Sequence, residues 1–232
     1  MQFQRVAGWA GLGFATSVII ANLVTAVTGQ PPGVGAGPDE VTAFFAEHGD
    51  AARVSSGIAP IAWMFLSVFA AGMFARLWKL EQPRGEAWSL VGLVGAGLLI
   101  AFFGTVISSQ IALVDGAGAD LWSLHNATFG VNAVGISIAV TGFSMAGLRT
   151  GVLRPWHAYV GLASGLLSLA GAATAPWSAT DAATALSGLG FAGFGLWILW
   201  VVTSALRLLR TRAGLHQGEV VSNTPRGAFN VE

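Results

Sequence analysis

Six long apolar segments, separated by polar breaks, constrain this chain of 232 residues more than any other feature. The apolar runs lie at about 6–28, 55–77, 88–113, 122–147, 156–175 and 183–206. Each is close to or above the ~20 residues that an α-helix needs to cross a hydrocarbon core about 30 Å thick. We therefore expect an all-α, polytopic membrane protein in which residues 1–212 form a six-helix transmembrane domain.

The first apolar run follows Arg5, as the apolar part of a signal peptide follows a basic residue. The run spans 23 residues, whereas the apolar part of a signal peptide has about 7–15. No clean cleavage site of small residues follows it. We expect it to be retained as the first transmembrane helix.

Ten of the eleven Lys and Arg residues lie in alternate gaps between the apolar runs. They occupy the N-terminus, the second loop, the fourth loop and the C-terminal tail: Arg5, Arg76, Lys79, Arg84, Arg149, Arg154, Arg207, Arg210, Arg212 and Arg226. The other three loops hold only Arg53. Because cytoplasmic loops of membrane proteins are rich in Lys and Arg, both termini are expected in the cytoplasm.

The formal net charge of zero conceals a polarised molecule. The outer loops carry seven of the eleven Asp and Glu residues, and the inner segments carry the other four together with ten bases. Topology and contact with anionic headgroups explain the basic inner face, so membrane lipids are expected partners and nucleic acid is not. With nine Trp and abundant Gly and Ala, a bacterial plasma membrane is the expected location.

Residues that usually carry membrane chemistry are scarce. There is no cysteine, which excludes disulfides, thiolate nucleophiles and iron–sulfur clusters. None of the six predicted helix cores contains Asp, Glu, Lys or Arg away from its ends, although coupled transporters normally keep such a residue. Only His125 lies well within a span, and no paired-His spacing suggests a metal. We expect no catalytic residue, no metal and no cofactor.

The first outer loop, residues 29–54, is the longest loop between the spans. Pro and Gly make its first half irregular. Pro38, Asp39 and Glu40 then predict the start of a short amphipathic helix over 39–49, with Phe44 and Phe45 on its apolar face and Gly49 as its end. We expect this helix to lie on the bilayer surface or to cap the bundle. Residues 213–232 lack apolar periodicity and predict a disordered cytoplasmic tail.

Small residues recur at spacings that let helix backbones approach each other in lipid. The pairs and runs are Ala7 and Gly11, Ala71 and Ala75, Gly161 and Gly165, and Gly188, Gly190, Gly193 and Gly195. Such stripes fit a compact bundle and equally an interface with a membrane-protein partner or a second copy of the chain. The segments 88–99 and 156–167 also resemble each other, which an old duplication and shared composition explain equally well.

The fourth predicted helix carries the only polar stripe with an ionisable residue inside a span. His125, Thr128 and Asn132 fall on one face, and Gly135 continues it where another backbone could come close. Asn22, Ser109 and Gln110 lie at a similar depth in other helices. Two interpretations remain open for these six residues: interhelical hydrogen bonds, or a polar-floored pocket for a lipid headgroup or small amphipathic molecule. His157, beside Trp156, is interpreted as an anchor at the membrane interface.

Two stretches carry a family resemblance. They are PDEVTAFFAEHGD at residues 38–50, and residues 124–171, which include LHNATFGVNAVG and GLRTGVLRPWHAYVGLASGLLSLAG. These stretches, with the predicted helix count, resemble small six-helix membrane proteins of actinobacteria that are grouped as families of unknown function. The resemblance implies six-helix topology and a bacterial source, and it carries over no catalytic residue.

Three functions follow from the sequence in order of preference. The first is a non-catalytic membrane protein that binds a lipid or apolar small molecule, or that stabilises a larger membrane complex. The second is a transporter or facilitator of small molecules or lipids. The third is a membrane enzyme with His125 as general base, oriented by an outer carboxylate such as Asp120.

Overall fold

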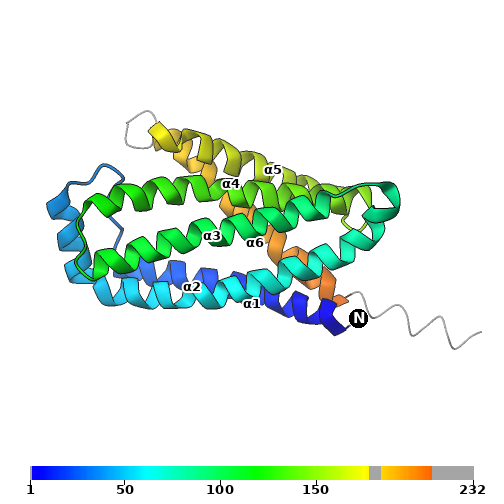
Figure 1. The fold of residues 1–232 in the computed structure, drawn as a ribbon, viewed down its shortest axis with the longest axis horizontal. Coiled ribbons are helices and arrows are strands. Elements are labelled where there is room, and N and C mark those ends of the chain that lie inside the picture. The colour runs from blue at the N-terminus through cyan, green and yellow to red at the C-terminus, as the bar shows by residue number, and fades with distance from the viewer. Residues whose placement is uncertain (1, 178–183, 211–232) are drawn as a thin grey trace, which may run out of the picture.

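The computed structural model describes residues 2–177 and 184–210, and this part of the chain consists of helices joined by short turns (Figure 1). The elements are α1 (Gln2–Thr28), α2 (Pro38–Glu81), η1 (Gln82–Arg84), α3 (Trp88–Val114), α4 (Asp120–Arg149), α5 (Pro155–Thr174), η2 (Ala175–Trp177) and α6 (Thr184–Arg210). Most of the gap between the fifth and sixth predicted runs, and the predicted tail at 213–232, lie outside the described residues.

Six of the described helices are long and apolar enough to cross a membrane, with spans of 23 to 47 residues. This confirms the prediction of an all-α fold with six helices of the length and apolar character that a membrane span requires. The helices run along the long axis of the molecule, and successive helices run in opposite directions (Figure 1). Helix α6 packs against both α5 and α1, so the sequence of helix contacts closes into a ring.

The two ends of this bundle differ in charge. We call the end that holds loops 29–37 and 115–119 the acidic end, because Asp39, Glu40, Glu47, Asp50, Asp115 and Asp120 gather there with Arg53. We call the opposite end the basic end. Its described charged residues are Arg5, Arg76, Lys79, Glu81, Arg84, Glu86, Arg149, Arg154, Arg207 and Arg210.

The first loop is shorter than the sequence suggests, because α2 already begins at Pro38. The expected short helix over 39–49 is present, but it does not end at Gly49. It continues into the membrane-crossing part of α2 through a break at His48, where φ is −112° and ψ is 15°. Gly49 is buried, and a Cβ there would lie 3.3 Å from Val114 Cγ1. This glycine therefore permits a close contact with α3 instead of stopping the helix.

The helical segment 38–48 caps the acidic end of the bundle. Val41 and Phe45 pack with Leu113 of α3 and Trp122 of α4 in a separate buried cluster. The Trp122 Nε1 group also donates a hydrogen bond to the carbonyl of Gly33, at 3.1 Å. Apolar packing and this bond tie the first loop and the start of α2 to the ends of α3 and α4.

Helices α3 and α4 approach most closely where glycines face the opposite backbone. A Cβ at Gly135 would lie 2.6 Å from the backbone nitrogen of Leu99, and a Cβ at Gly95 would overlap the backbone of Ala139. The expectation that another backbone approaches Gly135 is confirmed. In lipid, such backbone contact replaces the hydrophobic drive that packs helices in water.

Candidate functional site

His125 is the centre of a hydrogen-bonded group between α3 and α4, near the acidic end. Its Nδ1 lies 3.2 Å from the carbonyl oxygen of Val106 and 3.1 Å from Ser109 Oγ. The Ser109 hydroxyl donates to the same Val106 carbonyl at 2.8 Å. Because a carbonyl oxygen only accepts, Nδ1 carries the proton in this arrangement and Nε2 of the neutral ring is an acceptor.

Aromatic rings hold the His125 imidazole in place. The ring stacks on Trp122, with centroids 4.9 Å apart and an interplanar angle of 14°. Trp122 in turn meets Phe45 edge to face at 5.8 Å, and on the same capping segment Phe44 lies 4.9 Å from His48. The half-buried imidazole therefore lies under an aromatic cap, with its orientation fixed by both packing and hydrogen bonds.

Gln110, next to Ser109 in the chain, connects α3 to α2. Its Nε2 donates to the carbonyl of Ala52 at 3.3 Å and to Ser55 Oγ at 3.2 Å, both on α2. Ser109 and Gln110 thus join α3 to α4 and to α2 respectively. These contacts are interhelical hydrogen bonds, which is one of the two interpretations left open by the sequence.

The other three predicted site residues are placed differently. Asn132 is buried, and its Oδ1 has no hydrogen-bond partner within the described part of the chain. Thr128 is half-buried, and none of the hydrogen bonds described for residues 2–177 and 184–210 reaches it. Asn22 is exposed and donates only to Val18 of its own helix, at 2.9 Å. The structure therefore joins His125 directly to Ser109 and leaves Asn22 outside the hydrogen-bonded group.

The described charges at the acidic end of the bundle are largely negative. Arg53 forms an ion pair of 2.8 Å with Asp115 and a longer one of 3.7 Å with Asp50. The hydrogen bonds described for His125 go to Val106 and Ser109 and not to Asp120, the carboxylate that the enzyme hypothesis requires. Among the described residues, no three His, Asp or Glu side chains converge as ligands for a metal ion.

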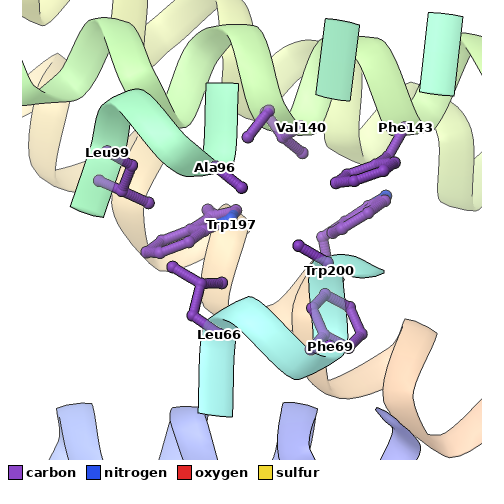
Figure 2. A pocket seen from close by; sticks show the side chains of 10 residues that line it. Leu66, Phe69, Ala96, Leu99, Val140, Phe143, Trp197 and Trp200 are labelled. Atoms are coloured by element: carbon purple, nitrogen blue, oxygen red, sulfur yellow. The ribbon is translucent and has the colours of Figure 1, made fainter. Parts of the chain in front are cut away.

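The middle of the bundle is filled by apolar side chains. Figure 2 shows Trp197 and Trp200 of α6 among Leu66, Phe69, Leu99 and Phe143. The gap between them has a volume of only about 10 Å³ and no polar lining. A bound water needs at least about that volume and two to four polar partners, so this gap is dry. None of the six predicted site residues lines it.

His157 corrects the prediction of an interfacial anchor, because it is fully buried. Its Nε2 lies 2.8 Å from Thr203 Oγ1 and 3.3 Å from Ser204 Oγ, both on α6. The Thr203 hydroxyl donates to the carbonyl of Leu199, so Nε2–H is the donor to Thr203. The adjacent polar pair Thr203 and Ser204, in the otherwise apolar stretch 188–206, is the sequence signal that could have revealed this contact.

Glu81, one of the four acids of the inner segments, is a second buried group near a helix end. Its side chain is fully buried, and Oε2 accepts a hydrogen bond from the backbone N–H of Ser89 at 2.9 Å. The N-cap residue of α3 is Ala87, whose methyl side chain cannot accept a hydrogen bond. Glu81, at the end of α2, therefore caps the N-terminus of α3, where the helix dipole favours a negative charge.

An ion pair near Glu81 joins the turn between α2 and α3 to the end of α4. Arg149 donates two hydrogen bonds to Glu86, at 2.7 Å and 2.5 Å. The hydrogen bond from Arg149 is the main reason that the pKa of Glu86 lies below its usual value, and the charges of Arg149 and Arg84 lower this pKa further. Arg84 also donates to the carbonyl of Arg149 at 3.0 Å.

Comparison of the chain with protein-family models, curated proteins and solved structures finds no match.

Proposed function

We propose that this chain is a non-catalytic protein of a bacterial plasma membrane that binds a lipid or another amphipathic molecule at the acidic end of its bundle. Six membrane-crossing helices and the separation of acidic and basic ends support a multi-pass arrangement with both termini in the cytoplasm. The acidic end then faces outward, and the ligand enters from the outer leaflet.

The arrangement of His125 is the observation that carries this proposal. Its Nδ1 is occupied by Val106 and Ser109, which makes Nε2 an acceptor for a hydroxyl or ammonium group of a ligand. The imidazole is oriented in advance by Trp122, so little conformational entropy is lost on binding. The carboxylates at the same end of the bundle favour a neutral or cationic headgroup over an anionic one.

The geometry gives less support to the two other functions. Transport would require a polar path between the ends, whereas apolar rings of Trp197 and Trp200 fill the middle of the bundle. Catalysis by His125 would require an orienting carboxylate, whereas its Nδ1 bonds to a carbonyl and a hydroxyl. A membrane-protein partner or a second copy of the chain stays compatible with the proposal, because either would contact the lipid-facing surface.

The test is native mass spectrometry of the full chain, extracted gently from its own membrane. We expect a stoichiometric lipid or small amphipathic molecule, with retention reduced about tenfold in His125→Ala, because one hydrogen bond to the ligand is lost. Asn132→Leu should lower retention as well. Asn22→Ala is the matched control, because Asn22 bonds only to its own helix, and it should retain the ligand fully.

Unchanged retention in both His125→Ala and Asn132→Leu would overturn the binding site. A stoichiometric protein partner with no bound small molecule would instead identify the chain as an accessory subunit. Flux of neutral or cationic amphiphiles into proteoliposomes above that of empty vesicles would favour the transporter over the binding protein.

A further inference from the structure

The capping segment, residues 38–48, joins the rest of α2 through one residue outside helical geometry. His48 has φ −112° and ψ 15°, and the chain is helical before and after it. Hinges in proteins are a few positions of this kind, at which a change of φ and ψ turns one rigid part against another. The break at His48 therefore gives the capping segment a point about which it can move as a unit.

After this break, directional polar contacts fix α2 to α3. The Gln110 side chain donates hydrogen bonds to the Ala52 carbonyl and to Ser55 Oγ, and Arg53 forms its ion pair of 2.8 Å with Asp115. The α2 partners in these contacts all lie within two helical turns of the break. Because hydrogen bonds weaken steeply when their geometry is lost, this part of α2 keeps its place when the capping segment moves.

Before the break, the capping segment is held by apolar packing. Val41 and Phe45 are buried in a cluster with Leu113 and Trp122. Within the described part of the chain, no hydrogen bond or ion pair joins a side chain of residues 38–48 to another helix. Apolar contacts have no fixed direction, and another apolar group can replace them. The capping segment is therefore the more easily detached of the two parts of α2.

Trp122 connects the capping segment to the candidate ligand-binding residue, His125. The Trp122 ring meets Phe45 of the segment at 5.8 Å and stacks on His125 at 4.9 Å. Its Nε1 donates to the Gly33 carbonyl, in the loop before the segment, at 3.1 Å. With the segment in place, Trp122 is only 5% exposed. Displacement of the segment would therefore uncover the ring that orients His125.

The loop before the capping segment offers little resistance to such a movement. It contains Gly33, Gly35 and Gly37, and a Cβ at any of these three positions would meet no atom within 4 Å. Glycine also adopts a wider range of backbone angles than other residues. The loop can therefore change shape without breaking side-chain contacts at these positions. One polar contact, from Trp122 to the Gly33 carbonyl, has to break.

We propose that residues 38–48 form a lid that pivots at His48 and uncovers the ring of Trp122. The movement follows from the break and from the different attachment of α2 on its two sides. Its role rests on the function proposed above, because the open lid admits the amphipathic ligand whose headgroup meets His125. An apolar chain of that ligand then packs on Leu113 and Trp122 in place of the lid, so the ligand favours the open state over the closed one.

The test of the movement is the distance between two spin labels, measured by double electron–electron resonance on the full chain in detergent. Because the chain has no cysteine, labels can be attached at Thr42→Cys on the lid and at Ala117→Cys after α3, both at exposed positions. We expect two distance populations, one for the closed lid and one for the open lid. The control pair, Val54→Cys on α2 after the hinge and Ile111→Cys on α3, is also exposed, and it should give one population.

Phe45→Ala should raise the ratio of open to closed lid about tenfold, because burial of the ring is lost only from the closed state. Glu40→Gln changes an exposed side chain of the same segment, and it should leave the ratio unchanged. A single distance between Thr42→Cys and Ala117→Cys that Phe45→Ala does not alter would overturn the lid. If circular dichroism shows that Phe45→Ala does not fold, Val41→Ala decides, because it removes a smaller part of the same packing.

A cross-link separates failure of the lid from failure of the binding function. A reducible bifunctional thiol reagent, of the length measured for the closed state, joins Thr42→Cys to Ala117→Cys. Native mass spectrometry then measures retention of added phosphatidylethanolamine, whose ammonium group can donate to His125 Nε2. We expect retention at least tenfold lower in the cross-linked chain than after the cross-link is reduced.

Equal retention before and after reduction would overturn the lid as the entrance to the site and would leave the binding function in place. No retention in either state, with a lid that the spin labels show to open, would overturn the binding function and would still confirm the movement.

Discussion

At the scale of single residues, Glu81 shows why a carboxylate can be kept out of water close to a membrane. Its Oε2 accepts the Ser89 N–H, which would otherwise be one of the unsatisfied donors at the start of α3. Its Oε1 is buried without a hydrogen-bond partner among the described residues. Burial of Oε1 without a partner is unfavourable, whereas the hydrogen bond of Oε2 caps α3. This cap explains why an acid occupies position 81.

Glu81→Ala is expected to destabilise the protein by about 0.5–2 kcal/mol, the usual cost of removing a helix cap. Glu81→Gln keeps an oxygen that can accept from Ser89, so it should lose less. Thermal unfolding of the purified protein in detergent measures the difference, and Lys79→Ala, an exposed neighbour, serves as the control. An unchanged melting temperature in Glu81→Ala would show that Glu81 does not cap α3.

His157 is also fully buried close to a helix end, but it donates its hydrogen bond, whereas Glu81 accepts one. Its Nε2 is engaged on α6, whereas its buried Nδ1 has no partner in the described part of the chain. The sequence places both His157 and Glu81 within a few residues of a helix end, where exposure is the usual outcome. Their burial depends on which helices pack over them, and that information lies in tertiary contacts with α6 and α3.

At the scale of elements, the bounds of the helices follow closely from the polar breaks. The predicted runs 88–113, 122–147 and 156–175 correspond to α3, α4 and α5 with shifts of at most two residues. The larger difference is α2, where Asp39, Glu40 and Glu47 hide a helix of 44 residues that is broken at His48. In the sequence, the charged residues of segment 38–48 look like part of a loop, so they do not indicate that this helix continues into the apolar run. Gly49 looks like the end of a helix, but here it is a glycine because α3 packs closely against it.

The close contact between α3 and α4 can be tested with two glycines on one helix. Gly95→Ala is expected to destabilise the bundle by about 1–3 kcal/mol, because its methyl group would meet the backbone of Ala139. Gly97→Ala is the control, since no atom lies within 4 Å of its Cβ position. Thermal unfolding should separate the two variants, and equal melting temperatures would contradict this packing.

The sequence predicts some features of the candidate site and not others. Helical periodicity groups His125 with Thr128 and Asn132 on one face, since the face of a helix follows from its repeat. The choice of partner does not follow: Ser109 reaches His125, whereas Asn22 at similar depth bonds within its own helix. Depth along a helix can be counted in residues, but rotation about the helix axis is fixed only by packing.

At the scale of the whole molecule, the separation of acidic and basic ends predicts its orientation. The chain has no cysteine, so a single introduced cysteine reports its own location. In intact cells, a membrane-impermeant maleimide should label Ala117→Cys at the acidic end and should not label Gln82→Cys at the basic end. After the cells are opened, both should react. The reverse pattern in intact cells would place the acidic end and the proposed ligand site on the cytoplasmic side.

The apolar side chains around Trp197 and Trp200, in the middle of the bundle, determine the free energy that an ion would need to pass between its two ends. An ion passing between the two ends would have to lose its hydration among Trp197, Trp200 and Phe143, where the narrow gap offers no polar contact. The cost of placing an unpaired charge in so apolar a region far exceeds the roughly 2.3 kcal/mol that a potential of 100 mV supplies per elementary charge. An ion on a path through the middle of the bundle would therefore meet a barrier that a potential of this size does not overcome.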